Sequence, residues 1–72
     1  MAQLRDEVLI RKVIEKIKKL REQQGVTLEQ FYNDTNIHLS RIESSKVNIS
    51  LSTLGAICKY FKISLSDFFK GI

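Results

Sequence analysis

The feature that most constrains the fold is a pair of short amphipathic segments around a polar break, within residues 27–43 (TLEQFYNDTNIHLSRIE). The break is the Asn-Asp-Thr-Asn run at residues 33–36, whose residue types favour turns and helix caps over a continuous helix. Helices this short cannot each bury a face alone, so both must pack against longer neighbours. Two short helices at a fixed angle on a small basic protein are a common way to place a helix in a DNA groove.

The size and composition indicate one globular, mainly helical domain that spans residues 1–72. The chain has no proline and three glycines, which favours helices, and no segment shows the sustained alternation of apolar and polar residues expected of strands. The formal net charge is +4. This mild basic bias suits a nucleic-acid partner, but solubility alone explains it equally well.

The cysteine content and the short apolar runs exclude several classes of protein. The single cysteine, Cys58, rules out an intramolecular disulfide, fits a reducing, cytoplasmic location, and is interpreted as a small buried side chain. One cysteine and one histidine cannot build a zinc site, so no metal and no cofactor are expected. Apolar runs do not exceed three residues, so no membrane-spanning segment is expected.

Hydrophobic spacing and capping residues predict five helices. Apart from the two central helices, they cover about residues 6–24, 51–61 and 65–70. Gly25 is placed to end the first helix, Ser50 caps the fourth, and Ser64 with Asp67 opens the fifth. The first helix carries its apolar side chains three and four residues apart, on one stripe.

The two central helices are expected on either side of the polar break. The second begins at Leu28, with Thr27 as its N-cap and Gln30 completing a capping box, and ends at residue 33 or 34. The third covers about residues 36–45. Either Asp34 or Thr35 is expected to cap it.

The inward faces of these helices predict the core. Its expected members are Ile10, Val13, Ile14, Ile17, Leu20, Leu28, Phe31, Tyr32, Leu39, Ile42, Leu51, Leu54, Ile57, Cys58, Tyr60, Phe61, Leu65, Phe68 and Phe69. Ile37 is placed either in this core or against a thymine methyl group.

Four motifs in order resemble the Cro/C1-type helix-turn-helix family, also called the xenobiotic-response-element family. They are IKKLREQQGVTLEQF, SRIESSK, the helix start SLSTL, and the ending SLSDFF, and together they cover about residues 14–69. The resemblance implies a five-helix, lambda-repressor-like DNA-binding domain, with residues 1–13 as an N-terminal helical extension. It also implies a sequence-specific transcriptional regulator, mostly a repressor, that binds double-stranded DNA as a homodimer.

The chain departs from the family pattern in a few places. Ser45 stands where the family usually has glycine, Ile49 where it often has proline, and Leu28 where it usually has glutamine. In addition, the distance from Gly25 to Arg41 is three residues shorter than usual. About one helical turn is therefore missing, either from the second helix or from the start of the third.

A helix that reads bases needs short polar or cationic side chains near its start, because the major groove presents a distinct donor and acceptor pattern for each base pair. Counting back from SRIE makes Thr35 the cap of the reading helix, followed by Asn36, His38, Ser40 and Arg41. Asparagine pairs with adenine and arginine with guanine through two hydrogen bonds each. For His38, a capping or packing role remains open beside a DNA contact, and for Arg41 a plain surface charge remains open.

Phosphate contacts are expected on both flanks of the reading helix. Thr27 and Gln30 stand at the start of the second helix, where free N–H groups and the helix dipole favour an anion. Lys46 and Asn48 follow the reading helix, and Ser44 or Ser45 is placed to join them. Such contacts supply affinity that depends on salt, but no sequence preference.

Two further expectations concern structure and assembly. By resemblance to the family, Arg21 and Glu43 form a partly buried ion pair that ties the first helix to the third. Dimerisation is expected because one short helix contacts only a few base pairs, whereas two copies match a palindrome. The candidate dimer faces are the C-terminal helix (Phe68, Phe69 and Ile72) and the N-terminal segment (Leu4, Val8 and Leu9).

The main alternative is a protein-interaction module that keeps the fold without binding DNA, which the shortened motif and the modest charge favour. An enzyme is not expected, because the chain has no nucleophile with a supporting base, no glycine-rich phosphate loop and no metal cluster.

Overall fold

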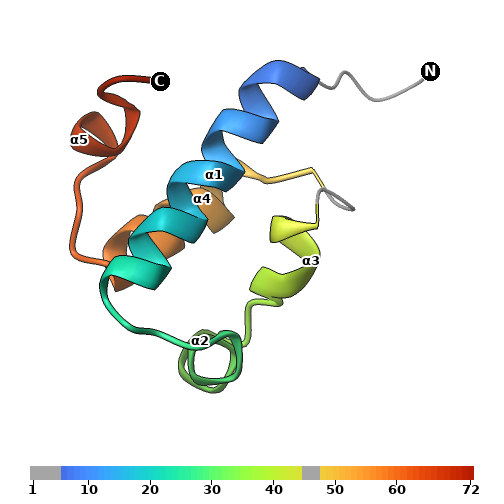
Figure 1. Cartoon of the computed structure of the whole chain (residues 1–72), viewed down its shortest axis with the longest axis vertical. Coiled ribbons are helices and arrows are strands. Elements are labelled where there is room, and N and C mark those ends of the chain that lie inside the picture. The colour runs from blue at the N-terminus through green and yellow to red at the C-terminus, as the bar shows by residue number, and fades with distance from the viewer. Residues whose placement is uncertain (1–5, 45–47) are drawn as a thin grey trace.

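The computed structural model describes residues 6–44 and 48–72, and every regular element in this part of the chain is an α-helix. The order is α1 (Glu7–Gln23), α2 (Leu28–Thr35), α3 (Leu39–Glu43), α4 (Leu51–Tyr60) and α5 (Leu65–Phe69). In Figure 1, α1 crosses in front of α4, with α2 at one end of the molecule and α5 with the start of α1 at the other. The predicted all-α, five-helix fold is confirmed. Residues 7–13 are the first turns of α1 itself.

The helix ends follow the predicted capping chemistry. The hydroxyls of Thr27, Ser50 and Ser64 each accept a hydrogen bond from the backbone N–H three residues later. At the other end of α1, Gly25 takes the left-handed conformation with φ +66°. The Val26 N–H then donates to the Arg21 carbonyl at 3.0 Å, which satisfies one of the last carbonyls of the helix.

The boundary between α2 and α3 differs from the prediction. Helix α2 continues to Thr35, and Asn36 ends it in the left-handed conformation with φ 63°. Helix α3 begins only at Leu39, and its cap position is occupied by His38, which makes no side-chain capping hydrogen bond. Asn36 is therefore the end of the first helix of the pair and not the start of the second.

The side chains of the polar break explain this shift. The Thr35 hydroxyl donates to the Phe31 carbonyl at 2.8 Å and accepts from the Ile37 N–H at 3.1 Å, so it supports the end of α2. The Asp34 carboxylate accepts a hydrogen bond from the Tyr60 hydroxyl on α4 at 2.6 Å. Both residues expected to cap α3 therefore have other partners.

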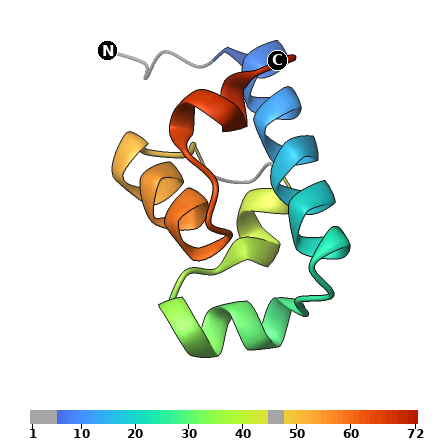
Figure 2. The same ribbon diagram turned by 90° about the vertical axis from the view of Figure 1, so that its left-hand side faces the viewer.

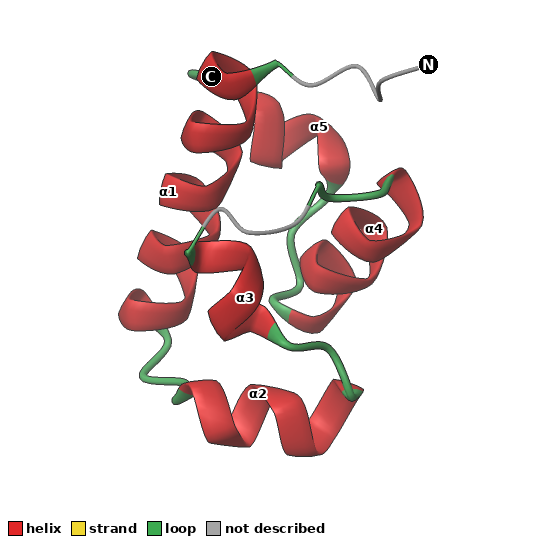
Figure 3. Cartoon of the chain, turned by 90° about the vertical axis from the view of Figure 1, so that its right-hand side faces the viewer, coloured by secondary structure: helices red, strands yellow, loops and turns green. Residues whose placement is uncertain are grey.

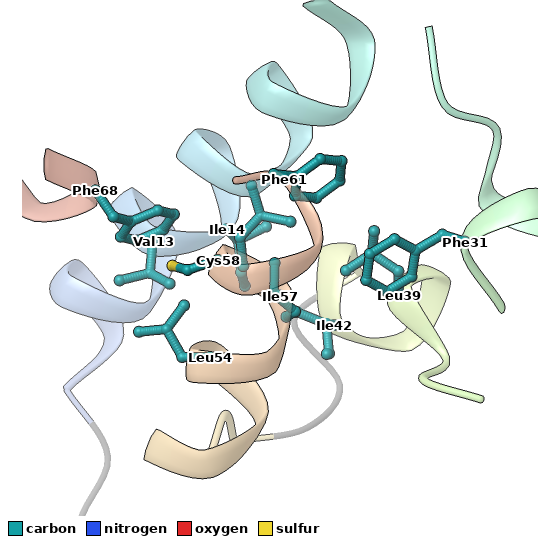
Figure 4. Close-up of a cluster of buried hydrophobic side chains, with 11 residues drawn as sticks. Val13, Ile14, Phe31, Leu39, Ile42, Leu54, Ile57, Cys58, Phe61 and Phe68 are labelled. Atoms are coloured by element: carbon teal, nitrogen blue, oxygen red, sulfur yellow. The ribbon is translucent and has the colours of Figure 1, made fainter. Parts of the chain in front are cut away.

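The core lies between α1, α3, α4 and α5, with α2 contributing one side chain (Figure 4). The buried members are Val13, Ile14, Ile17, Phe31, Leu39, Ile42, Leu54, Ile57, Cys58, Phe61 and Phe68. Phe31 is fully buried, with its ring 4.7 Å from that of Tyr60 and 5.5 Å from that of Phe61. Ile10, Leu20, Ile37 and Tyr60 pack around this cluster and are partly buried.

Five residues predicted for the core are exposed, namely Leu28, Tyr32, Leu51, Leu65 and Phe69. Leu28, Leu51 and Leu65 are the first residues of α2, α4 and α5. In each of these helices the buried residues come later in the sequence. Tyr32 is exposed because Phe31 alone fixes the buried side of α2, and the next residue points about 100° away from it.

Candidate nucleic-acid interface

Helix α3 presents a polar face between two buried anchors. Leu39 and Ile42 are buried, whereas Ser40 and Arg41 between them are exposed. Figure 3 shows α3 in front of the gap between α1 and α4, on the face of the molecule away from α5. Within the described residues, no ion pair or hydrogen bond engages the Arg41 guanidinium. Its charge is available to an external partner.

The Arg21–Glu43 ion pair fixes α3 against α1. The Arg21 Nε donates to Glu43 Oε2 at 2.8 Å and its Nη2 donates to Oε1 at 3.2 Å, while both side chains are at most 14% exposed. The third nitrogen of the Arg21 guanidinium, Nη1, donates to the Val26 carbonyl at 3.0 Å. The hydrogen bonds to Glu43 raise the pKa of Arg21 above its ordinary value. This two-point contact sets the orientation of α3 and its exposed face.

An open hollow of about 260 Å³ adjoins the exposed side of α3. Its lining comprises Ile37, His38, Arg41, Ile42, Asn48, Ile49 and Thr53, so it lies between α3 and the start of α4. Three predicted DNA contacts, His38, Arg41 and Asn48, are thus brought together, and Ile37 lies half-buried between core and hollow. Thr53 is a polar neighbour that the sequence analysis did not include.

A second contact missed by the sequence analysis is the stacking of Tyr32 on His38. The two ring centroids are 4.4 Å apart, with the rings tilted by 32°. Both residues are exposed; Tyr32 lies on α2, and His38 occupies the cap position of α3. The helical phase set by Phe31 is the signal that would have placed Tyr32 on the surface.

The remaining predicted contacts are spread over the motif. Thr27 and Gln30 are exposed at the start of α2, roughly 12 Å along the helix from its other end. The Thr27 hydroxyl already accepts the Gln30 N–H at 3.0 Å. At the end of α3, the Ser44 hydroxyl donates to the Arg41 carbonyl at 2.9 Å. Lys46 and Ser45 lie outside the described residues.

The described part of the chain holds neither a metal-binding cluster nor a membrane-spanning helix. Residues 6–44 and 48–72 contain no group of three or more histidine, cysteine or acidic side chains that would hold a metal ion. None of the described helices is long and apolar enough to cross a membrane. Cys58 is buried, and this burial raises the pKa of its thiol, so it is a packing residue and not an exposed nucleophile.

The motif geometry agrees with a comparison against protein-family models, in which a helix-turn-helix model matches residues 17–68. The chain belongs to the Cro/C1-type helix-turn-helix family. Members of this family are DNA-binding regulatory domains and are not typically enzymes. Curated proteins and solved structures give no match.

The two helices of the motif differ in length. The matched region includes α2, which has eight residues, whereas α3 has only five and starts three residues later than the pattern predicted. His38 occupies the cap position of α3, and Arg41 is the third residue of the helix.

Proposed function

We propose that this protein is a sequence-specific transcriptional regulator that represses by occupying a palindromic operator as a homodimer, with α3 in the major groove. The observation that carries the proposal is the two-sided character of α3: Leu39 and Ile42 anchor its back, while Ser40 and Arg41 face outward. The major groove admits one helix. An arginine on that helix can donate two hydrogen bonds to the O6 and N7 acceptors of a guanine.

The phosphate backbone would be held from the flanks of α3. Thr27 and Gln30 lie at the start of α2, where unpaired N–H groups and the helix dipole favour an anion. Asn48 precedes α4, and Lys46 and Ser44 follow α3 in the sequence. These contacts would orient the domain and supply the affinity that depends on salt.

A dimer is proposed because α3 is very short. Five helical residues rise about 7.5 Å, which covers only two or three base pairs. Two copies related by a two-fold axis would read two half-sites and multiply the discrimination. The apolar surface at the end of the molecule opposite α2 supports such a contact, because Leu9, Leu51 and Phe69 are exposed there around one hollow.

The experiment that tests the proposal is the binding of the full chain to mixed duplex DNA at low and moderate salt, followed by selection of preferred sequences from a random pool. If the protein neutralises two phosphates, its affinity for DNA should fall on the order of 10-fold when the salt concentration rises about fourfold. More phosphate contacts would give a larger loss. The pool should return a symmetric sequence with two half-sites. Undetectable binding at low salt would refute the regulator.

Arg41→Ala tests the role of α3 directly. We expect specific binding to weaken by about 1–3 kcal/mol and the preference at one or two base positions to relax. Lys59→Ala is the matched control, because Lys59 is an exposed cation on α4 outside the hollow beside α3. If the two substitutions lower the affinity for all DNA sequences equally, Arg41 on α3 does not contact a base.

The second candidate function is a protein-interaction module that retains the fold. The short α3 favours it, because a helix of five residues offers little surface to enter the groove. The salt experiment separates the two functions, since only the regulator predicts affinity for a duplex.

A further inference from the structure

The rings of Tyr32 and His38 pack against each other although both residues are exposed. Tyr32 lies on α2 and is 39% exposed, and His38 precedes α3 and is also exposed. Their ring centroids are 4.4 Å apart. The pair connects α2 to the residue that precedes α3, across the turn between the two helices.

His38 keeps its polar atoms available. It occupies the cap position of α3 but makes no capping hydrogen bond, and no other hydrogen bond to its ring is found within the described residues. It lines the same hollow as Arg41, which lies three residues later on α3. Stacking covers one face of the imidazole and leaves its nitrogen-bearing edge open, since the two rings are only 32° from parallel.

We propose that His38 reads a purine in the major groove and that Tyr32 is the residue that positions its ring for this contact. An imidazole N–H donates to the N7 acceptor of a purine, and a ring held in one plane donates in one direction. A histidine on an exposed cap would otherwise sample several side-chain conformations and lose entropy on binding. The stack restricts it before DNA is bound, which is how preorganisation increases affinity.

This inference rests on the proposed function, and it goes further by assigning one base position to one side chain. Arg41 and His38 would read neighbouring positions from successive turns, with His38 leading. A residue that merely supported the fold would not change the preference at a single base position.

The test uses the full chain and the duplex selected from the random pool, together with the variants of that duplex at each position. We expect His38→Ala to weaken binding about tenfold and to remove the preference at one purine position. Tyr32→Ala should weaken binding about threefold and reduce the preference at that same position. Tyr32→Phe retains the ring and should behave as the unmodified chain does.

Two readouts separate positioning from folding. Proton NMR of the free protein should show the His38 ring resonances moving in Tyr32→Ala but not in Tyr32→Phe, because the neighbouring ring shields them. Asn33→Ala, a change at an exposed neighbour on α2, should leave both the resonances and the base preference unchanged. Melting temperature then shows whether each variant remains folded.

Three results would overturn the inference. The first is that Tyr32→Ala weakens binding to every duplex equally, which indicates a phosphate contact. The second is that the preference survives His38→Ala, and the third is that the two variants affect different base positions. Absence of binding by the unmodified chain would instead refute the proposed function, and the base assignment would fall with it. Both proposals are supported if His38→Ala binds mixed duplex normally and has lost the preference at one purine position.

Discussion

Tyr60 is a partly buried residue whose hydroxyl connects two helices. It donates to the Asp34 carboxylate at 2.6 Å and so joins α4 to the end of α2. Its ring also contacts Phe31, the one side chain that α2 places in the core. Asp34 is one of the two residues predicted to cap α3, but its carboxylate instead accepts this hydrogen bond between helices.

The contact predicts a specific pH dependence. The hydrogen bond to Asp34, followed by partial burial and the nearby negative charge, raises the pKa of Tyr60 above its ordinary value. A raised pKa in the folded state means that the contact stabilises the protein fully below about pH 10, the ordinary pKa of tyrosine, and is lost as the pH rises through the folded-state pKa. Phenolate absorbance measures this titration in a Tyr32→Phe background, where Tyr60 is the remaining tyrosine.

The matched variant is Asp34→Asn, which keeps the shape of the side chain and removes its charge. We expect it to lower the midpoint of the Tyr60 titration. An unchanged midpoint would show that the hydrogen bond does not persist in solution.

Among the elements, α3 depends most on contacts made outside itself. A five-residue helix has almost no intrinsic stability, and it lacks a side-chain cap. Two anchors hold it, the burial of Leu39 and Ile42 and the two-point contact between Glu43 and Arg21. The exposed face of α3 is therefore maintained by tertiary packing.

Glu43→Gln tests the second anchor. The amide keeps the size of the side chain but loses the charge that the Arg21 guanidinium faces in a mostly buried position. We expect the free energy of unfolding to fall by about 2 kcal/mol, measured by urea denaturation. Glu15→Gln, on the exposed side of α1, is the control and should change stability by less than about 0.5 kcal/mol. Similar values for both variants would mean that the ion pair contributes little.

At the scale of the whole molecule, the apolar and polar surfaces lie in different places. The helix pair α2–α3 occupies one end and one side, whereas α5 and the start of α1 lie at the other end (Figure 2). The exposed side chains of Leu9, Leu51 and Phe69 border a hollow of about 210 Å³ at that second end. Both candidate dimer faces, from opposite ends of the chain, therefore contribute to one surface, although Phe68 belongs to the core and Leu4 lies outside the described residues.

Phe69→Asp tests whether this surface holds the proposed dimer. Two copies related by a two-fold axis would bring the new carboxylates close together in an apolar contact, so we expect the substitution to convert a dimer to a monomer. Sedimentation equilibrium measures the mass. Leu65→Asp is a closely matched control, since Leu65 is on the same helix and equally exposed, at 41%. If Phe69→Asp still has the mass of a dimer, the dimer contact lies elsewhere on the molecule.

The sequence by itself determined most of the helices, their caps and the buried anchors of α3. These features follow from local rules, since a serine or threonine followed by a periodic apolar pattern specifies a helix start and its inward face. Capping by Thr27, Ser50 and Ser64 and the burial of Leu39 and Ile42 illustrate this.

Only the tertiary structure decided where the polar break is divided between α2 and α3. Asp34 and Thr35 are good caps in isolation, but Tyr60 and the last turn of α2 provide each of them with another partner. The pairing of Tyr32 with His38 and the convergence of Leu9 with Phe69 also required the folded chain. The physical reason is that local propensities differ by about 1 kcal/mol or less, so a single long-range contact is enough to choose between them.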